Sequence, residues 1–431
     1  MTAAPADRAP RVLIIIQNLH VPFDRRVWLE CQSLRRAGYD VTVVCPAGPD
    51  SRPFEVIDGV EVHTYRSRPS SGGARGYVVE YAHSFLATAR LVAKARRRGR
   101  IDVLQACNPP DIFWPIARWL RMRDGTRFVF DHHDLCPELF RSRFNGTDGP
   151  ALRGLMALER ATFRTADAVT STNASYARVA TERGGKPSEA VTVVRTGPDP
   201  ERLRRGPEDP AWRGGRTHLV AYLGVMGPQD GVDLAIDAAA HVVHEMGRDD
   251  VTFVLMGGGD CFEELVQRRD RLGLRDHVVM TGRVPDETVL SVLSSADVGL
   301  SPDPRNPLNE VSTMNKTMEY MAFELPVVAF DLVETRVSAG ESAVYADGDD
   351  VVSYAHALVA LLDDPEARSR MGRAGRRRVL DELAWKHQEA PYVGVFDRLV
   401  GIERTPVVIP APRAAADASV VDALVASPGD A

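Results

Sequence analysis

Short apolar runs alternate with longer segments of helical periodicity along most of the chain. The first run, residues 12–16 (VLIII), is continuous, which is typical of a parallel strand covered on both faces. A helical segment, residues 26–37, follows it, and Gly38 is the expected C-cap before the next apolar run, residues 41–45. This β–α–β order predicts a Rossmann-like unit.

The same alternation continues to about residue 200, stops, and then starts again. A segment rich in Gly, Pro and charged residues, 205–215, is the expected linker. The pattern predicts two α/β domains, residues 1–200 and 216–385, then a helix at 386–404 and an Ala/Pro-rich tail at 405–431 that is expected to be disordered. The predicted strands are 60–64, 103–106, 128–131, 168–171, 191–195, 219–223, 252–256, 278–281, 298–300 and 327–330, and the predicted helices are 78–98, 112–121, 151–165, 234–244, 263–272, 286–294, 354–362 and 374–399.

Length and composition agree with this division and narrow the class of protein. A chain of 431 residues is too long for one ordinary core, and 44% hydrophobic with 26% charged residues is typical of a globular protein in water. The five cysteines are scattered without CxxC spacing, which favours a reducing compartment without disulfides or structural zinc. We find no signal peptide and no apolar run of about 18 residues, so the sequence predicts a cytoplasmic protein.

Charge is divided unevenly between the two halves. Residues 1–200 hold 29 basic and 21 acidic residues, whereas the remainder holds 24 and 38. Arginine-rich runs at residues 90–100 and 118–127 suggest an anionic partner, such as headgroups at the inner face of the plasma membrane or a lipid diphosphate. A solvated arginine-rich surface explains the pattern equally well. No nucleic-acid-binding motif accompanies the charge, so nucleic acid is not an expected partner.

The segment at residues 314–331, MNKTMEYMAFELPVVAFD, carries the most specific chemical signal. Asn315 and Lys316 stand at the predicted start of a short helix, where a cation and free backbone N–H groups suit a diphosphate. Glu319, one turn further on, can accept hydrogen bonds from sugar or ribose hydroxyls. Pro326 then begins a buried strand. The combination suits a nucleotide-sugar.

This segment resembles the donor site of the retaining glycosyltransferases of family four, which have the GT-B fold, and the resemblance covers roughly residues 11–400. It implies two facing Rossmann-like domains with parallel sheets and a C-terminal helix that crosses back to the first domain. It implies that the second domain holds a nucleotide-diphosphate sugar, and that the first holds an acceptor, lipid-linked or polysaccharide. It also implies transfer with retention, without a metal or other cofactor.

Two histidines follow the predicted strand 128–131, at the strand end that faces the cleft in the resembled fold. The resemblance places His133 there, beside the donor sugar, with His132 as the alternative. The adjacent Asp134 is expected to fix the tautomer of His133. No second ligand set at a recognisable spacing accompanies this HHD string, so no metal site is predicted.

The loops expected beside the donor phosphates depart from the family pattern. The first, NLHVPFDRR, lacks paired glycines; Asp24 is an expected N-cap, and Arg25 and Arg26 either reach an anion or stay at the surface. In the second domain, Gly224 and Gly227 permit close approach of the backbone to a phosphate or sugar.

The second of these loops also lacks the basic residues that relatives place around the diphosphate. Val225 or Met226, and Asp230, stand at those positions. Lys316 and Arg283 are therefore the expected counter-charges for the leaving phosphate, an electrostatic role.

Family members carry two glutamates with seven residues between them. Glu319 fits the second, but eight residues separate it from Glu310, and Val311 occupies the family position. Either the loop is shifted by one residue and Glu310 contacts the donor, or Glu310 is not equivalent.

Two other functions fit the same fold. A sugar-nucleotide 2-epimerase acts on the donor alone, and a non-catalytic GT-B-like protein is favoured by the missing basic residues. A dehydrogenase is the weakest option, because the glycine-rich loop at residues 256–260 lacks the spacing of a dinucleotide fingerprint.

Overall fold

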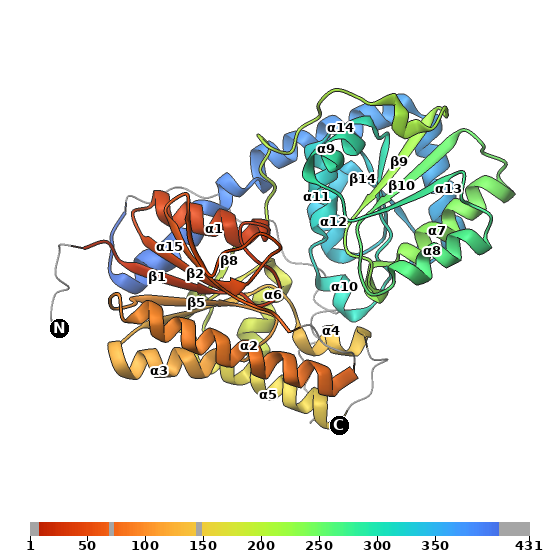
Figure 1. The fold of residues 1–431 in the computed structure, drawn as a ribbon. Helices are drawn as coiled ribbons and strands as arrows, with labels where there is room; N and C mark the ends of the chain where they lie inside the picture. The colour runs from red at the N-terminus through yellow and green to blue at the C-terminus, as the bar shows by residue number, and fades with distance from the viewer. Residues whose placement is uncertain (1–7, 69–72, 144–148, 405–431) are drawn as a thin grey trace.

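A computed structural model describes residues 8–68, 73–143 and 149–404 of the chain. Within them the chain forms two α/β domains, each built on one sheet, which face each other (Figure 1). No helix in these ranges is long and apolar enough to cross a membrane. The predicted disordered tail lies outside the described residues.

The first sheet has eight strands in the order β3-β4-β2-β1-β5-β6-β7-β8. Neighbouring strands are parallel, apart from the antiparallel pair β3–β4 at one edge. Sequence analysis missed β3, because its four residues are short, partly exposed and mixed in polarity. The strands are β1 (Arg11–Ile15), β2 (Asp40–Pro46), β3 (Phe54–Ile57), β4 (Val60–Tyr65), β5 (Val103–Cys107), β6 (Arg127–His132), β7 (Ala168–Ser171) and β8 (Val191–Val193).

Helices cover both faces of this sheet, so its strands are buried on both sides. Helices α2 (Gly73–Arg96), α3 (Trp114–Asp124) and α5 (Pro150–Thr165) share one core with it. Helices α1 (Arg25–Arg36) and α15 (Trp385–Val400) share the other. Two short helices, α4 (Cys136–Arg143) and α6 (Ala174–Arg178), follow the carboxyl ends of β6 and β7.

The second sheet has six parallel strands in the order β11-β10-β9-β12-β13-β14. In both sheets the first strand lies between the second and a later one, which is the arrangement that opens a ligand crevice at the carboxyl edge. The strands are β9 (His218–Leu223), β10 (Val251–Met256), β11 (Val278–Gly282), β12 (Val298–Ser301), β13 (Val327–Phe330) and β14 (Ala343–Ala346). The helices are α7 (Val232–Ala240), α8 (Phe262–Arg271), α9 (Asp286–Ser295), α10 (Pro307–Val311), α11 (Asn315–Ala322), α12 (Val333–Ala339), α13 (Val351–Asp363) and α14 (Pro365–Arg378), with short turns at Ser188–Ala190, Pro210–Arg213, Pro228–Asp230 and Gly340–Ser342 and wider turns at Val179–Arg183, His241–Glu245 and Val379–Leu383.

The final helical stretch is broken where it passes between the domains. Sequence analysis predicted one helix over residues 374–399, but α14 ends in a wide turn and Ala384 is extended before α15 begins. The chain also crosses in the other direction here, at Gly197, where a Cβ would lie 2.1 Å from Leu383 O. The two segments that connect the domains therefore pack against each other, and residue 197 has to be a glycine.

As expected for the GT-B fold, α15 packs on the first domain (Figure 1). Trp385 Nε1 donates to Ser33 Oγ at 2.9 Å, and Tyr39 OH donates to Asp397 Oδ1 at 2.6 Å. The helix thus completes the core on this side of the first sheet, although it comes last in the chain.

Trp385→Ala is expected to lower the free energy of unfolding by about 3–5 kcal/mol, because it removes a buried indole and leaves a cavity. Chemical denaturation measures the change. Lys386→Ala, at the exposed next position of the same helix, is expected to change it by less than about 0.5 kcal/mol. Equal effects of the two substitutions would mean that α15 does not contribute to the core.

Candidate functional site

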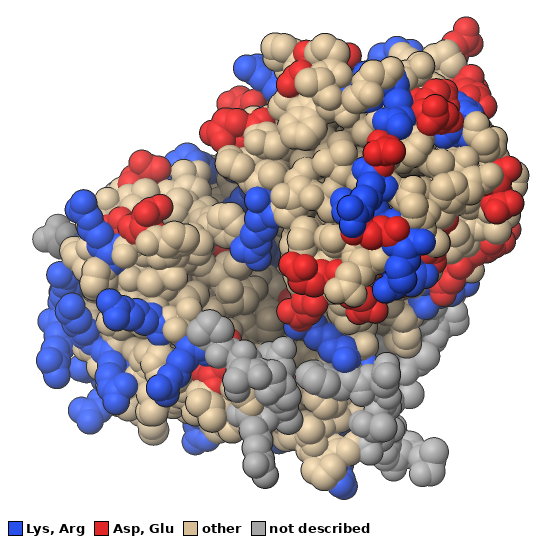
Figure 2. Space-filling model, turned by 45° about the vertical axis from the view of Figure 1, so that its right-hand side comes forward, with Lys and Arg blue, Asp and Glu red and all other residues tan. Residues whose placement is uncertain are grey.

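The carboxyl edges of the two sheets meet each other through direct contacts. Asn173 Nδ2, after β7, donates to Val311 O at 2.8 Å, and Tyr176 OH lies 2.9 Å from Ser312 Oγ. An apolar cluster joins both domains at the same place; its members are Leu135, Tyr176, Val179, Leu308 and Val311. Figure 2 shows the surface hollowed along the line where the domains meet. The structure is thus a closed arrangement of the two edges.

His133 lies at this edge, in the turn that follows β6. Asn108 Oδ1 accepts hydrogen bonds from the backbone N–H groups of His133 (2.6 Å) and Asp134 (3.1 Å), which fixes the turn. His133 Nε2 lies 2.5 Å from Asp131 Oδ2. Arg26 Nε also lies 2.9 Å from Nε2, but the Asp131 carboxylate is nearer and only accepts. The proton therefore belongs on Nε2, Arg26 makes no hydrogen bond to that atom, and Nδ1 is left as an acceptor that no described residue occupies.

The carboxylate that fixes this tautomer differs from the predicted one. Sequence analysis assigned Asp134, the neighbour in sequence, whereas the structure uses Asp131. His133 lies in the turn just beyond β6, so strand periodicity did not distinguish the two carboxylates in advance. Burial raises the pKa of Asp134 instead.

Asp131 is the centre of a buried ion pair. Its Oδ1 accepts from Arg26 Nη2 at 2.9 Å and from Thr170 Oγ1 at 2.7 Å. Burial alone would raise the pKa of Asp131, but the Arg26 guanidinium and His133 outweigh it and hold that pKa well below 3.8. Burial and the Asp131 charge raise the pKa of Glu30 well above its usual range. Arg26 Nε also lies 3.0 Å from Glu30 Oε1, so one guanidinium serves two buried carboxyl groups, of which Asp131 is the more acidic.

A glutamine connects this pair to the last helix. Gln105 Nε2 donates to Glu30 Oε2 at 2.7 Å and to Asp131 Oδ2 at 3.2 Å, and its Oε1 accepts from Tyr392 OH at 2.7 Å. All four side chains are buried. The tautomer of the cleft histidine therefore depends on a network that reaches α15.

Two sequence candidates on this side do not face the cleft. Arg26 is only 5% exposed and also donates to Val194 O. It therefore neither reaches an anion in the cleft nor lies at the surface. His132 is fully buried between Phe163 and Tyr176, and burial lowers its pKa to about 3. Its side chain is neutral and lies in the core. The reason is that β6 extends as far as His132, so the strand directs this side chain inward.

In the second domain, Lys316, the expected counter-charge for the leaving phosphate, already pairs with an acid. Its Nζ lies 2.5 Å from Asp303 Oδ1 and 5.4 Å from the centre of the Tyr222 ring. Burial alone would lower the pKa of Lys316, but Asp303 and Asp230 outweigh it and raise that pKa. Burial, with Asp303 nearby, raises the pKa of Asp230 to about 6. At neutral pH the ammonium group of Lys316 therefore lies beside two carboxylates, those of Asp303 and Asp230.

Glu319 lies on α11 as predicted, and a residue of the first domain contacts it. Arg25 Nη1 lies 3.1 Å from Glu319 Oε1, and Arg25 Nη2 lies 2.8 Å from Asp286 Oδ1. Arg283 is exposed, and its guanidinium stands 6.0 Å from the centre of the Phe23 ring, also of the first domain. No ion pair joins Arg283 to another described residue. Arg25 and Arg283 thus lie at the boundary between the domains, where Arg143 and Arg195 of the first domain also approach acids of the second.

The two glycine-containing loops of the second domain pack against each other. Gly224 N donates to Met256 O at 3.1 Å, and Met226 N donates to Gly258 O at 3.1 Å. A Cβ on Gly257, whose φ is +138°, would lie 1.8 Å from Gly224 O. These glycines are needed for the loops to pack. Gly227 N donates to Asp230 Oδ2 at 2.9 Å, so its loop is closed on itself.

The remaining candidates in the second domain have different environments. The Glu310 carboxylate accepts from Val333 N at 3.0 Å and lies 3.1 Å from Arg305 Nε, so it holds the start of α12. Val311, at the family position of the first glutamate, is in the apolar cluster between the domains. Asn315 is exposed at the first position of α11, and no described side chain orients it.

Cys107, Asp131 and His133 bring potential ligand atoms within 4.8 Å of one another. Arg26 already supplies the positive charge for Asp131. A metal ion would have to displace that guanidinium from a buried site, so the group is better suited to holding a proton than a metal.

Comparisons with known proteins agree with this arrangement of two facing domains. The model described as Glycosyltransferase Family 4 matches residues 24–202, and the model described as Glycosyl transferases group 1 matches residues 217–364. Sucrose-phosphate synthase from Thermosynechococcus elongatus superposes with a TM-score of 0.72 at 16% identity, over 91% of this chain and 100% of that chain. Anabaena HepE, solved with UDP-glucose, gives a TM-score of 0.66 at 14% identity, over 90% and 99%.

Curated relatives by sequence are also glycosyltransferases. The 2-deoxystreptamine glucosyltransferase of Streptomyces kanamyceticus is 27% identical over 58% of this chain and 65% of its own length. The GDP-mannose-dependent α-(1-6)-phosphatidylinositol monomannoside mannosyltransferase of Mycolicibacterium smegmatis is 30% identical over 47% and 55%. The chain spans less than two thirds of the length of these relatives.

The fold and the two facing edges define a GT-B protein. Within that class, the chain is a glycosyltransferase of the family 4 type.

Asp131→Asn is expected to lower the free energy of unfolding at pH 7 by about 3 kcal/mol, because buried Arg26 would keep only Glu30, 3.0 Å away, as a partner acid. The folded pKa of Asp131 lies below 3.8, so the stability from this pair is present above that pH and is lost as pH falls through the folded pKa. Urea unfolding at a series of pH values should show the two proteins converging only at strongly acid pH.

His133→Gln is the matched control, because it leaves the ion pair intact. Its expected effect is below about 1.5 kcal/mol. A loss as large as that of Asp131→Asn would place the stabilising interaction at the histidine instead.

Proposed function

We propose that this protein transfers a sugar from a nucleotide-diphosphate donor to an acceptor, with retention of the anomeric configuration. The observation that carries the proposal is the placing of two consecutive arginines. Arg26 Nε lies 2.9 Å from His133 Nε2 in the first domain, and Arg25 reaches Glu319 in the second. The candidate sugar-binding histidine and the candidate hydroxyl-binding glutamate are therefore each contacted by one of two consecutive residues at the start of α1.

The donor is proposed to lie with its nucleotide on the second domain. Glu319 accepts hydrogen bonds from its hydroxyls, and Arg25 leaves that carboxylate to contact the diphosphate. Arg283 is the second cation for the phosphates, and charge that develops on the leaving phosphate is stabilised electrostatically. A guanidinium suits this exchange because it binds carboxylate and phosphate in the same two-point geometry. The UDP-glucose bound to Anabaena HepE supports a nucleotide-sugar as the ligand.

The sugar is proposed to lie against His133. Its Nδ1, the unprotonated nitrogen, accepts a hydrogen bond from a sugar hydroxyl while Asp131 keeps the ring in that tautomer. No side chain is assigned as a nucleophile, in keeping with front-face reaction on the donor. Closure of the two domains on the bound donor would exclude water and so suppress hydrolysis of the donor.

The acceptor is proposed to be a lipid-linked saccharide or polysaccharide intermediate on the first domain. The excess of basic residues in the first half supports an anionic acceptor. A relative whose name specifies a phosphatidylinositol mannoside as acceptor supports a lipid-linked one.

One observation favours a second candidate, a GT-B protein that binds no donor. The cation on α11 is already neutralised by Asp303, with Asp230 beside it. Isothermal titration with UDP-, GDP- and dTDP-sugars separates the two functions. Product analysis with donor alone tests the epimerase alternative, because an epimerase needs no acceptor.

A panel of nucleotide-sugars should raise the melting temperature of the protein, and the best donor should identify the base. Glu319→Ala and Arg25→Ala are each expected to weaken that donor roughly 10- to 100-fold, because each removes a hydrogen bond to a charged group. Lys316→Ala should weaken it as well, since buried Asp303 would then be unpaired. Titration calorimetry measures the affinities.

Lys386→Ala and Glu366→Ala, at exposed positions outside the cleft, are the matched controls and should bind the donor as the native protein does. Full affinity in Glu319→Ala and Arg25→Ala together would show that the donor site lies elsewhere.

Donor affinity is expected to rise a few-fold as pH falls from about 7.5 to 5.5. The pKa of Asp230 is about 6, so its carboxylate becomes neutral over this range and stops repelling the diphosphate. Asp230→Asn, which retains an oxygen to accept from Gly227 N, should bind as the native protein does at low pH and show no such dependence. An unchanged pH profile in Asp230→Asn would contradict this assignment.

A further inference from the structure

The outer helical layer of the first domain carries cations without partners. Helices α2, α3 and α5 lie side by side over one face of the first sheet (Figure 1). Lysine and arginine gather over the first domain, whereas acidic and basic residues intermingle on the second (Figure 2). The cations of these three helices and of the turn just after α2 that form no ion pair with a described acid are Arg90, Lys94, Arg97, Arg118, Arg123, Arg153 and Arg164.

The few acids on the same helices are already occupied. Glu80 accepts from Gln17, Asp124 binds Arg96 in a two-point ion pair, and Glu159 lies 2.6 Å from Arg183. The layer therefore carries a clear excess of positive charge.

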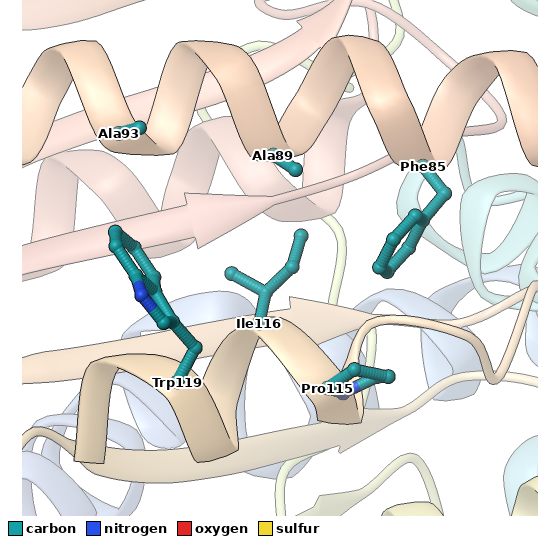
Figure 3. A pocket seen from close by; sticks show the side chains of 6 residues that line it. All are labelled: Phe85, Ala89, Ala93, Pro115, Ile116 and Trp119. Carbon is teal, nitrogen blue, oxygen red and sulfur yellow. The ribbon is translucent and has the colours of Figure 1, made fainter. Parts of the chain in front are cut away.

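Exposed apolar groups lie among these cations. Leu86 on α2 is 53% exposed and Met122 on α3 is 75% exposed, and Val78 and Val79 are exposed near the start of α2. Between α2 and α3 runs a groove of about 220 Å³ (Figure 3). Its lining is apolar and consists of Phe85, Ala89, Ala93, Pro115, Ile116 and Trp119.

We propose that this α2–α3–α5 face docks on an anionic phospholipid bilayer. The basic side chains contact the headgroup phosphates, and Leu86, Met122 and the groove take up the upper part of the acyl chains. A purely electrostatic partner, such as a nucleic acid or an acidic polysaccharide, would explain the cations but not the exposed apolar groups between them. Charge together with exposed apolar area is the combination that holds a protein at a bilayer interface.

The same face is joined to the edge of the cleft. Gln17, which follows β1, donates to Glu80 Oε1 at 3.1 Å and lies 3.4 Å from Ser84 Oγ, both in the first half of α2. The apolar half of α2 is therefore next to the carboxyl edge of the sheet. Docking would bring that edge, and with it the acceptor side of the cleft, to the membrane surface.

The inference is tested by vesicle flotation with the full chain and no substrate. The native protein should float with vesicles of equal phosphatidylcholine and phosphatidylglycerol, but not with phosphatidylcholine alone, and salt should release it. Arg90→Gln/Lys94→Gln/Arg97→Gln should weaken vesicle binding at least about tenfold. The matched control is Arg370→Gln/Arg373→Gln/Arg377→Gln on α14, which removes the same charge from exposed positions of the other domain.

Leu86→Ser/Met122→Ser distinguishes a bilayer from a polyanion. It should weaken binding to vesicles and leave binding to heparin unchanged. Brominated acyl chains should quench tryptophan fluorescence, and Trp119→Phe should remove much of that quenching, since Trp119 lines the groove.

Three results would overturn the inference: no flotation at low salt, equal loss in the α14 control, or heparin binding as tight as vesicle binding with no effect of Leu86→Ser/Met122→Ser. Because no sugar donor is present, these results are independent of the proposed transfer reaction. Donor binding measured by calorimetry should be the same in all four variants.

Discussion

The ion pair between Arg26 and Asp131 is the interaction on which the cleft side of the first domain depends. Both side chains are buried, so each charge is tolerated only because the other is present. Asp131 in turn fixes His133, and Gln105 extends the network to Tyr392 in the last helix. One carboxylate therefore connects the start of α1, the end of β6 and the helix that returns from the second domain.

The same pair determines which way Arg25 points. Successive residues on a helix are about 100° apart, so a helix start that turns Arg26 into the core turns Arg25 away from it. Here that direction leads to Glu319 and Asp286 of the second domain. The inward arginine organises the histidine, and the outward one crosses the cleft. Two residues that look alike in the sequence thus have opposite roles, and their environments alone separate them.

The sequence predicted the fold well and the site only partly. Continuous apolar runs marked nearly all the strands, because buried parallel strands leave little choice of residue, and the polar segment around Glu319 marked one edge of the cleft. The partners of the charged residues were missed. Lys316 meets Asp303, thirteen positions earlier, and Arg26 meets Asp131, more than a hundred positions later. Neither pair follows from spacing, since each joins the start of a helix to an acid at or just after the end of a strand, and the two meet only in the folded domain.

The distribution of charge around the cleft indicates that both domains are needed to hold an anionic donor. The second half of the chain is strongly acidic, and its one buried lysine is matched by Asp303 with Asp230 beside it. Such a domain on its own is poorly suited to an anionic donor. Arg25 of the first domain and Arg283, which stands over Phe23 of the first domain, bring positive charge to the boundary. A diphosphate at that boundary would be neutralised only when both domains contribute, so donor binding would itself favour the closed arrangement. Closure and charge neutralisation are then the same event, and a donor held by one domain alone would be held weakly.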